Sequence, residues 1–209
     1  NLPSTVALQD CLRSRGHDGA DIADSRFVAE GIAEYVKDGL SIEEAVKKTY
    51  PLITGAFCIL VMTKEKLIVI RDVCGIRPLC FAKLNGGWIV SSETCGLKPI
   101  GATFVRDVNP GEMIVIDESG VKSEQLVPPN PKLDVFEFVY FARASSELLG
   151  KSVYEVRKRF GAQLARERNI DADIVIAVPD TANPVALGYA QESKIPLEFG
   201  IGKNRYIQR

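Results

Sequence analysis

The pattern of apolar and polar positions changes character twice along the chain. Up to about residue 50, apolar residues recur every three or four positions, which predicts amphipathic helices over 4–15, 26–39 and 41–50. The next apolar residues form short runs separated by turn residues, a pattern typical of antiparallel strands. After residue 133, strand-like and helical segments alternate, which predicts parallel strands joined by crossover helices.

Local signals place the ends of several elements in the first part. Asp24 or Ser25 can cap the second helix, and Ser41 with Glu44 has the spacing of a capping box. The tetrapeptide LNGG at 84–87 lies between two apolar runs and predicts a tight hairpin. Strands are expected in the runs 55–63, 66–72, 78–84, 87–93, 104–108 and 112–117.

A proline-rich stretch divides the chain. VPPNPK at 127–132 has three prolines in six residues, which excludes a regular element and indicates a linker. Residues 1–127 are therefore expected to form an α+β domain, with a linker at 128–133 and an α/β domain from 134 to 209. Strands are expected at 136–142, 172–180 and 197–202, and helices at 153–167 and 184–191.

Composition narrows the class of protein. Of 209 residues, 46% are hydrophobic and 25% charged, with a net charge of −1, so an ordinary core is expected and binding to nucleic acid or an anionic membrane is not. The five cysteines are odd in number and include no CxxC, which disfavours a disulfide framework and a zinc knuckle. No apolar run has transmembrane length, and a reduced, cytoplasmic protein is expected.

Three polar segments are candidate anion sites, each with a simpler interpretation. DESG at 117–120 follows an apolar strand, as ribose-phosphate loops do, but a hairpin turn is the favoured interpretation. Residues 180–183, DTAN, lie between an expected strand and a helix, where they could bind an anion or simply cap the helix. KNRYIQR at 203–209 could be a phosphate clamp or a solvated basic turn.

Together these segments are more specific than any one of them. RDVCGIRPLC, WIVSSETCGL, GATFVRDVNPGEMIVI, FEFVYFARASSELLGKSVYEVRKRFGAQLARE, VPDTANPVALGYA and KNRYIQR occur in this order over essentially the whole chain. In that order they resemble amidophosphoribosyltransferases, also called glutamine phosphoribosylpyrophosphate amidotransferases. FEFVYFARAS and KNRYIQR separate this family from related amidotransferases that make amino sugars or asparagine.

The resemblance implies a fold and an activity. It implies an N-terminal-nucleophile glutaminase sandwich, followed by the start of a type I phosphoribosyltransferase domain. Such enzymes transfer ammonia from glutamine to phosphoribosylpyrophosphate, with Mg²⁺, in the first step of purine synthesis. The nucleophilic cysteine is expected upstream of Asn1, so no catalytic residue is expected in this chain and the chain alone is expected to be inactive. A regulatory or binding homologue that lacks the nucleophile is the alternative.

The resemblance also implies roles for particular residues. Asp24 matches the aspartate that binds the α-amino group of glutamine, although its neighbours differ from the family pattern. Thr181 matches the hydroxyl associated with Mg²⁺ and pyrophosphate. Lys203, Arg205 and Tyr206 match the start of the loop that closes over phosphoribosylpyrophosphate and contacts inhibitory purine nucleotides. Asp134 stands where some members have an iron–sulfur ligand, so no cluster is expected. A homo-oligomer is expected as well.

Overall fold

The structure is a computed structural model that describes residues 6–17, 23–168, 170–204 and 206–207. The chain packs as two compact units. The first comprises residues up to Leu79 together with Val108–Leu133, and the second comprises Cys80–Asp107 together with residues from Asp134 onward. In the part of the chain that is described, no helix is long and apolar enough to cross a membrane.

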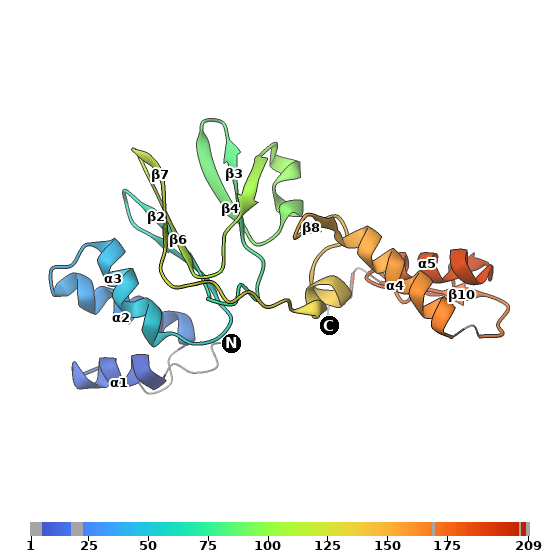
Figure 1. Ribbon diagram of the computed structural model, residues 1–209, viewed down its shortest axis with the longest axis horizontal. Helices are drawn as coiled ribbons and strands as arrows, with labels where there is room; N and C mark the ends of the chain where they lie inside the picture. The colour runs from blue at the N-terminus through green and yellow to red at the C-terminus, as the bar shows by residue number, and fades with distance from the viewer. Residues whose placement is uncertain (1–5, 18–22, 169, 205, 208–209) are drawn as a thin grey trace. The chain divides into compact units, whose positions relative to one another are not determined.

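The first unit combines helices with a four-stranded antiparallel sheet in the order β1-β2-β6-β7 (Figure 1). Its helices are α1 (Val6–Ser14), α2 (Asp24–Lys37), α3 (Ile42–Thr49) and the short 3₁₀ turn η1 (Tyr50–Leu52). Its strands are β1 (Cys58–Met62), β2 (Leu67–Arg71), β6 (Glu112–Asp117) and β7 (Gly120–Gln125). The predicted α+β pattern is thus present in this unit.

One face of this sheet packs against the helices. Ile68 and Ile70 of β2 are two residues apart and therefore point to the same side of the strand. Both are buried in one cluster with Met113 and Val115 of β6 and with apolar side chains of all three helices. Those helical side chains include Leu8, Leu12, Phe27, Val28, Ile32, Ala45 and Val46. Burial of these helical stripes explains the spacing of three to four residues in the sequence.

The helix starts are only partly as predicted. The capping box of α3 is present, because the Ser41 side chain accepts from the Glu44 amide and the Glu44 carboxylate accepts from the Ser41 amide. Capping of α2 by Asp24 or Ser25 was a wrong prediction. Ala23 occupies the N-cap position without a side-chain hydrogen bond, and Asp24 is the first helical residue. Its carboxylate there complements the positive end of the helix dipole.

The segment DESG at 117–120 is the turn of a hairpin. Strands β6 and β7 pair from Glu112–Gln125 to Asp117–Gly120, with Gly120 at φ 116°. The Ser119 amide donates to the Asp117 carboxylate over 2.8 Å, which is the local bonding of an Asx turn. The turn interpretation is therefore confirmed. Strand β7, with the polar sequence GVKSEQ, carries no apolar pattern that predicted it.

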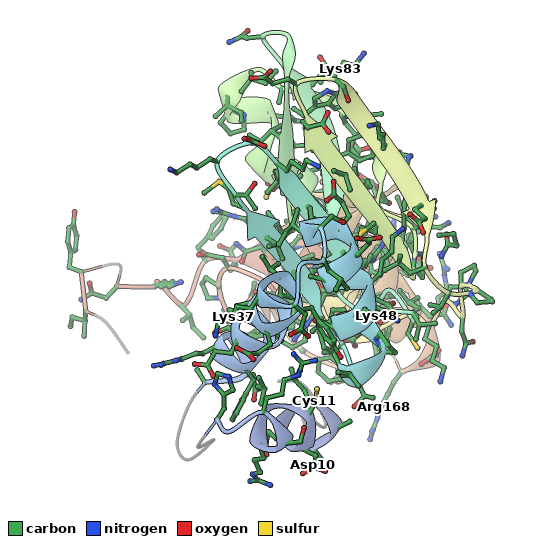
Figure 2. All side chains as sticks on the ribbon, turned by 90° about the vertical axis from the view of Figure 1, so that its left-hand side faces the viewer. Asp10, Cys11, Lys37, Lys48, Lys83 and Arg168 are labelled. Atoms are coloured by element: carbon green, nitrogen blue, oxygen red, sulfur yellow. The ribbon has the colours of Figure 1, made fainter. Side chains whose placement is uncertain are left out.

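The second unit contains a three-stranded antiparallel sheet in the order β4-β3-β5. Its strands are β3 (Cys80–Leu84), β4 (Gly87–Ser91) and β5 (Thr103–Asp107), with the 3₁₀ turns η2 (Thr94–Gly96) and η3 (Lys98–Ile100) between β4 and β5. The predicted hairpin at 84–87 is confirmed, with Asn85 and Gly86 at positive φ. Lys83, labelled in Figure 2, lies near this hairpin. Its ammonium group is 5.2 Å from the centroid of the Trp88 ring.

The remaining elements of the second unit alternate between helix and strand from residue 153 onward, as expected. They are the π-helical turn η4 (Glu137–Phe141), the short hairpin strands β8 (Glu147–Leu148) and β9 (Lys151–Ser152), α4 (Val153–Glu167), β10 (Val175–Ile176), α5 (Asn183–Ser193) and β11 (Leu197–Glu198). Helix α4 has the predicted bounds, and β10 pairs with β11 in parallel, as predicted. Both of these strands are shorter than the apolar runs that contain them.

The strand predicted at 136–142 is wrong. Glu137–Phe141 form a π-helical turn, in which Glu137 and Phe138 are buried, as is Ala142 directly after it. A strand would place Phe138, Tyr140 and Ala142 on one face, but Tyr140 is half exposed. A short apolar run does not separate these two possibilities by itself.

The proline-rich stretch has no helix or strand, as predicted. It is nevertheless held in place within the first unit. The amide of Asn130 donates to the carbonyl of Val73 and that of Lys132 to the carbonyl of Cys74, both over 2.9 Å. Whether 128–133 is also the limit between two functional domains stays a prediction.

Candidate functional site

The loops that follow β10 and β11 form the candidate site. Val175 pairs with Leu197 and Ile176 with Glu198 in parallel, so the two strands end at the same edge. Residues 177–182 leave one strand and residues 199–204 leave the other. Ligands of open α/β sheets bind beyond the carboxyl ends of the strands, which is where these loops lie.

The first loop leads directly into helix α5. The peptide between Pro179 and Asp180 is cis, and the helix begins at Asn183 with Pro184 in its first turn. Ala182 is at the N-cap position with no side-chain hydrogen bond. The simpler interpretation of DTAN, an N-cap by a polar side chain, is therefore wrong. Amides and the dipole at such a helix start favour an anion.

The second loop contributes a positive charge to the first. Lys203 Nζ lies 3.7 Å from a carboxylate oxygen of Asp180, and both side chains are about half exposed. The structure thus brings Lys203 next to the residue that precedes Thr181, although the two are far apart in the sequence. Because both side chains are exposed, this ion pair contributes little stability. The Lys203 ammonium group can therefore leave Asp180 and bind an oxygen atom of a ligand.

Of the two other residues predicted for this loop, the structure describes only Tyr206. Arg205 lies outside the described residues. Tyr206 is 98% exposed, and its amide donates to the Asn204 side chain over 3.0 Å. The phosphate-loop roles of Arg205 and Tyr206 remain predictions.

Thr181 adds a hydroxyl group to the loop that carries the Asp180 carboxylate. Thr181 is half-buried and immediately follows Asp180. Mg²⁺ sites at phosphate ligands commonly use only one or two protein oxygens, with phosphates and waters completing the octahedron. A hydroxyl beside a carboxylate fits that requirement. Among the described residues, no three His, Cys, Asp or Glu side chains cluster in a way that could hold a metal.

Asp24, the predicted glutamine ligand, lies in the first unit. It is exposed at the start of α2, and residues 18–22 before it are outside the described part of the chain. Arg26, which departs from the family pattern, donates to Glu30 over 2.8 Å within the same helix. Its charge is thereby directed along the helix, away from its N-terminal end where Asp24 lies.

Sequence reasoning missed the role of Arg71 and Asp72. The Arg71 guanidinium donates to the carbonyls of Arg77 and Gly75 over 2.9 Å, and to that of Val108. Asp72 is 1% exposed and accepts from the amides of Phe57, over 3.3 Å, and Cys74, over 2.9 Å. The two side chains fix the shape of the Gly- and Pro-containing loop 72–79. An Arg-Asp pair at the end of an apolar strand was the available signal.

The five cysteines are all free thiols. Cys11 Sγ lies 3.9 Å from the Tyr35 hydroxyl between α1 and α2, and Figure 2 shows it on α1. Cys58 donates to main-chain carbonyls of the 72–79 loop. None lies at the candidate site described above. The prediction of thiols without a disulfide framework is confirmed.

Comparison with known proteins shows what the chain is related to. Residues 4–99 match the model of a glutamine amidotransferase domain. A solved glutamine phosphoribosylpyrophosphate amidotransferase from B. subtilis, in complex with ADP and GMP, superposes on the whole chain with a TM-score of 0.93 and 35% identity. This chain is an amidophosphoribosyltransferase homologue. A second solved structure, described as the allosteric regulatory enzyme of purine biosynthesis, matches to the same degree.

Curated amidophosphoribosyltransferases from several bacteria are also similar to this chain in sequence. The Mycobacterium leprae protein is 47% identical over 169 residues, which is 81% of this chain and 30% of that protein. The Synechococcus elongatus protein is 41% identical over the whole chain, which spans 43% of its length. The chain therefore spans less than half the length of the amidophosphoribosyltransferases it matches. The likeness in fold extends from the amidotransferase segment through the loops around Thr181 and Lys203.

Proposed function

We propose that this chain is the central part of an enzyme that makes 5-phosphoribosylamine. In this reaction glutamine is hydrolysed to glutamate and ammonia. The ammonia nitrogen forms a bond to C1 of phosphoribosylpyrophosphate and loses a proton, and the C1–oxygen bond to pyrophosphate breaks. The observation that carries the proposal is the match of the whole chain, across both of its units, to a solved amidotransferase at 35% identity.

We assign the transferase substrate to the loops after β10 and β11. The start of α5 offers main-chain amides to the pyrophosphate, and Lys203, 3.7 Å from Asp180, offers a mobile positive charge. Thr181, with Asp180, would hold Mg²⁺, which neutralises pyrophosphate charge when bound. Arg205 and Tyr206 are proposed to follow Lys203 around the same ligand. In this proposal the loops of the second unit form the start of the phosphoribosyltransferase domain.

We assign glutamine to the first unit, with Asp24 as the partner of its α-amino group. The carboxylate is exposed at the start of α2, so an ammonium group can approach it. The cysteine nucleophile is proposed to lie outside residues 1–209. The 209-residue chain on its own is therefore expected to turn over neither substrate, and no iron–sulfur cluster is expected in the complete protein.

Purine nucleotides are the proposed inhibitors. The B. subtilis relative was solved with ADP and GMP. A nucleotide carries phosphates of the same kind as the substrate, so the charge of Lys203 would attract both. A homo-oligomer also remains part of the proposal.

The test is an assay of the full-length protein that contains this chain. With phosphoribosylpyrophosphate and Mg²⁺, either glutamine or ammonia should yield phosphoribosylamine and pyrophosphate. Glutamine should also yield one glutamate for each phosphoribosylamine. If neither nitrogen donor gives product while purine nucleotides still bind, the protein is a regulatory homologue and the proposed activity is wrong.

A further inference from the structure

A corner at Glu93 and Thr94, between β4 and η2, binds a segment some fifty residues further along the chain. One Glu93 carboxylate oxygen accepts from the Arg143 amide over 2.8 Å and from the Ser146 hydroxyl over 2.6 Å. The Thr94 hydroxyl accepts from the Glu147 amide over 2.8 Å. All of these residues belong to the second unit. We call residues 143–147 the clasped segment.

Arg157 holds the chain just before the clasped segment. This side chain of α4 is 2% exposed and donates to the carbonyls of Phe138 and Ala142, over 2.6 and 2.7 Å. Burial lowers the pKa of the Arg157 guanidinium below its ordinary value, and the negative charge of Glu93 opposes that effect. Arginine stays charged in proteins. Two opposite charges therefore fix successive parts of one stretch of main chain.

The corner is built to hold this geometry. The Ser91 hydroxyl donates to the Glu93 carbonyl over 2.9 Å and accepts from its amide over 3.3 Å. Ser146 is 1% exposed and Thr94 is 9% exposed. A buried polar group that loses its partner is costly, so the Ser146 and Thr94 hydroxyls favour the closed corner.

These hydrogen bonds join a part of the chain that matches the amidotransferase domain to a part that lies beyond that match. Glu93 and Thr94 fall inside residues 4–99, which match the glutamine amidotransferase domain. The clasped segment lies beyond that match and leads into α4, which packs against α5, the helix that follows the loop with Asp180 and Thr181. A displacement at either end is therefore transmitted through short hydrogen bonds, two of which are partly buried.

We propose that Glu93 is a positioning residue that keeps ammonia transfer coupled between the two activities. The inference rests on the proposed function. In that function, ammonia that escapes before it reaches C1 is lost to water. Glu93 touches neither substrate in this assignment. Its role is to hold the end of the amidotransferase segment against the start of the segment that bears the transferase loops.

The experiment compares Glu93→Ala with Lys98→Ala in the full-length protein. Lys98 and Glu147 join the same two segments, but their side chains are 73% and 57% exposed and 3.7 Å apart, so Lys98→Ala is the matched control. The measured quantity is phosphoribosylamine formed per glutamate released. Ammonia-dependent synthesis is measured beside it.

We expect Glu93→Ala to lower the ratio of phosphoribosylamine to glutamate by about tenfold, the lower end of the scale set by loss of a charged hydrogen-bond acceptor. Ammonia-dependent synthesis should stay within about twofold of wild type, as a local uncoupling requires. Lys98→Ala should leave both unchanged. If Glu93→Ala does not fold, Ser146→Ala removes one of the two donors to the same oxygen and should lower the ratio to a smaller extent.

Two results would overturn the inference. An unchanged ratio in the folded variants would show that the corner does not couple the activities. An equal loss with glutamine and with ammonia, at a constant ratio, would show a purely structural role. Failure of the wild-type protein to make phosphoribosylamine from either donor would instead refute the proposed function, so the two failures are distinguishable.

Discussion

Replacement of Gly161 by alanine should separate α4 from α5. A Cβ atom at Gly161 would lie 1.8 Å from the Val185 carbonyl oxygen and 2.8 Å from the Tyr189 amide nitrogen. The contact is reciprocal, because a Cβ at Gly188 would lie 1.9 Å from the Lys158 carbonyl oxygen. Each helix thus places a glycine against the backbone of the other, and no side-chain rotation can relieve the overlap.

The cost follows from these distances. Ordinary contact begins at 3.4 Å, so the helix backbones would have to move apart by up to the missing 1.6 Å. Alanine gains about 1 kcal/mol of helix propensity over glycine. Against this, overpacking costs about 1–3 kcal/mol or more, and a wider gap forfeits dispersion contacts along both helices. We expect a gross cost of about 4 kcal/mol, above the usual range because the obstacle is backbone, and hence a net local destabilisation of about 3 kcal/mol.

Amide hydrogen exchange in the full-length protein measures this locally. Peptides from α4 and α5 should exchange roughly a hundredfold faster in Gly161→Ala, while peptides from β6 and β7 should be unchanged. Gly31→Ala is the matched helical control. A Cβ there would meet mainly the flexible end of the Leu8 side chain, at 2.6 Å, so its effect should stay within about 1 kcal/mol. Equal protection of α4 and α5 in wild type and Gly161→Ala would refute the reasoning.

Three further predictions concern single side chains in the full-length protein. Asp24→Ala should raise the KM for glutamine and spare ammonia-dependent synthesis, because the carboxylate pairs with one substrate only; equal loss with both donors would show a structural role. Lys203→Gln should raise the KM for phosphoribosylpyrophosphate and weaken nucleotide inhibition by about tenfold, the lower end for a charged contact since the side chain is half exposed. If both constants stay within about twofold, the assignment of this loop is wrong. Burial and the charge of Asp72 raise the pKa of Tyr50 from 10.0 to about 12, so its contribution is complete below pH 10 and is lost as pH rises to 12. In the wild type, the free energy of unfolding should therefore fall by up to about 2–3 kcal/mol between pH 10 and pH 12 because of Tyr50, and Tyr50→Phe should lack this fall. Chemical unfolding at several pH values measures it, and the same dependence of the unfolding free energy on pH in both proteins would contradict the prediction.

The elements that could be predicted are those with a local cause. The capping box of α3 needs only Ser41 and Glu44, and the hairpin at 84–87 needs only Asn85 and Gly86 at positive φ. Helix α4 has a Ser152 cap, whose hydroxyl accepts from the Glu155 amide. In each case the deciding contacts lie within a few residues, so spacing in the sequence is sufficient.

The features that escaped prediction depend on distant partners. The turn at Glu137–Phe141 is held by Arg157, which lies at least sixteen residues further along the chain. Its guanidinium donates to the carbonyl of Phe138 in the turn and to that of Ala142 directly after it. Arg71 similarly donates a hydrogen bond to the carbonyl of Val108, 37 residues away. At the candidate site, the sequence predicted that Thr181 follows one strand and that Lys203 begins the basic segment after another. It is the parallel pairing of β10 with β11 that brings the two loops to one edge of the sheet.

The second compact unit contains residues from both sides of the proline-rich stretch, namely Cys80–Asp107 and the residues from Asp134 onward. The amidotransferase match ends at residue 99, inside that unit, so the sequence limit of the family domain does not coincide with the limit of packing. A cut at the proline-rich stretch would leave Glu93 and Thr94 on one polypeptide and their partners Arg143 and Ser146 on the other. Each product would then carry a buried hydroxyl, Thr94 in one and Ser146 in the other, without its partner across the corner, which is costly. The two parts are therefore expected to lose stability when they are separated at residues 128–133, and the hydrogen bonds that would be lost are the ones we assign to coupling.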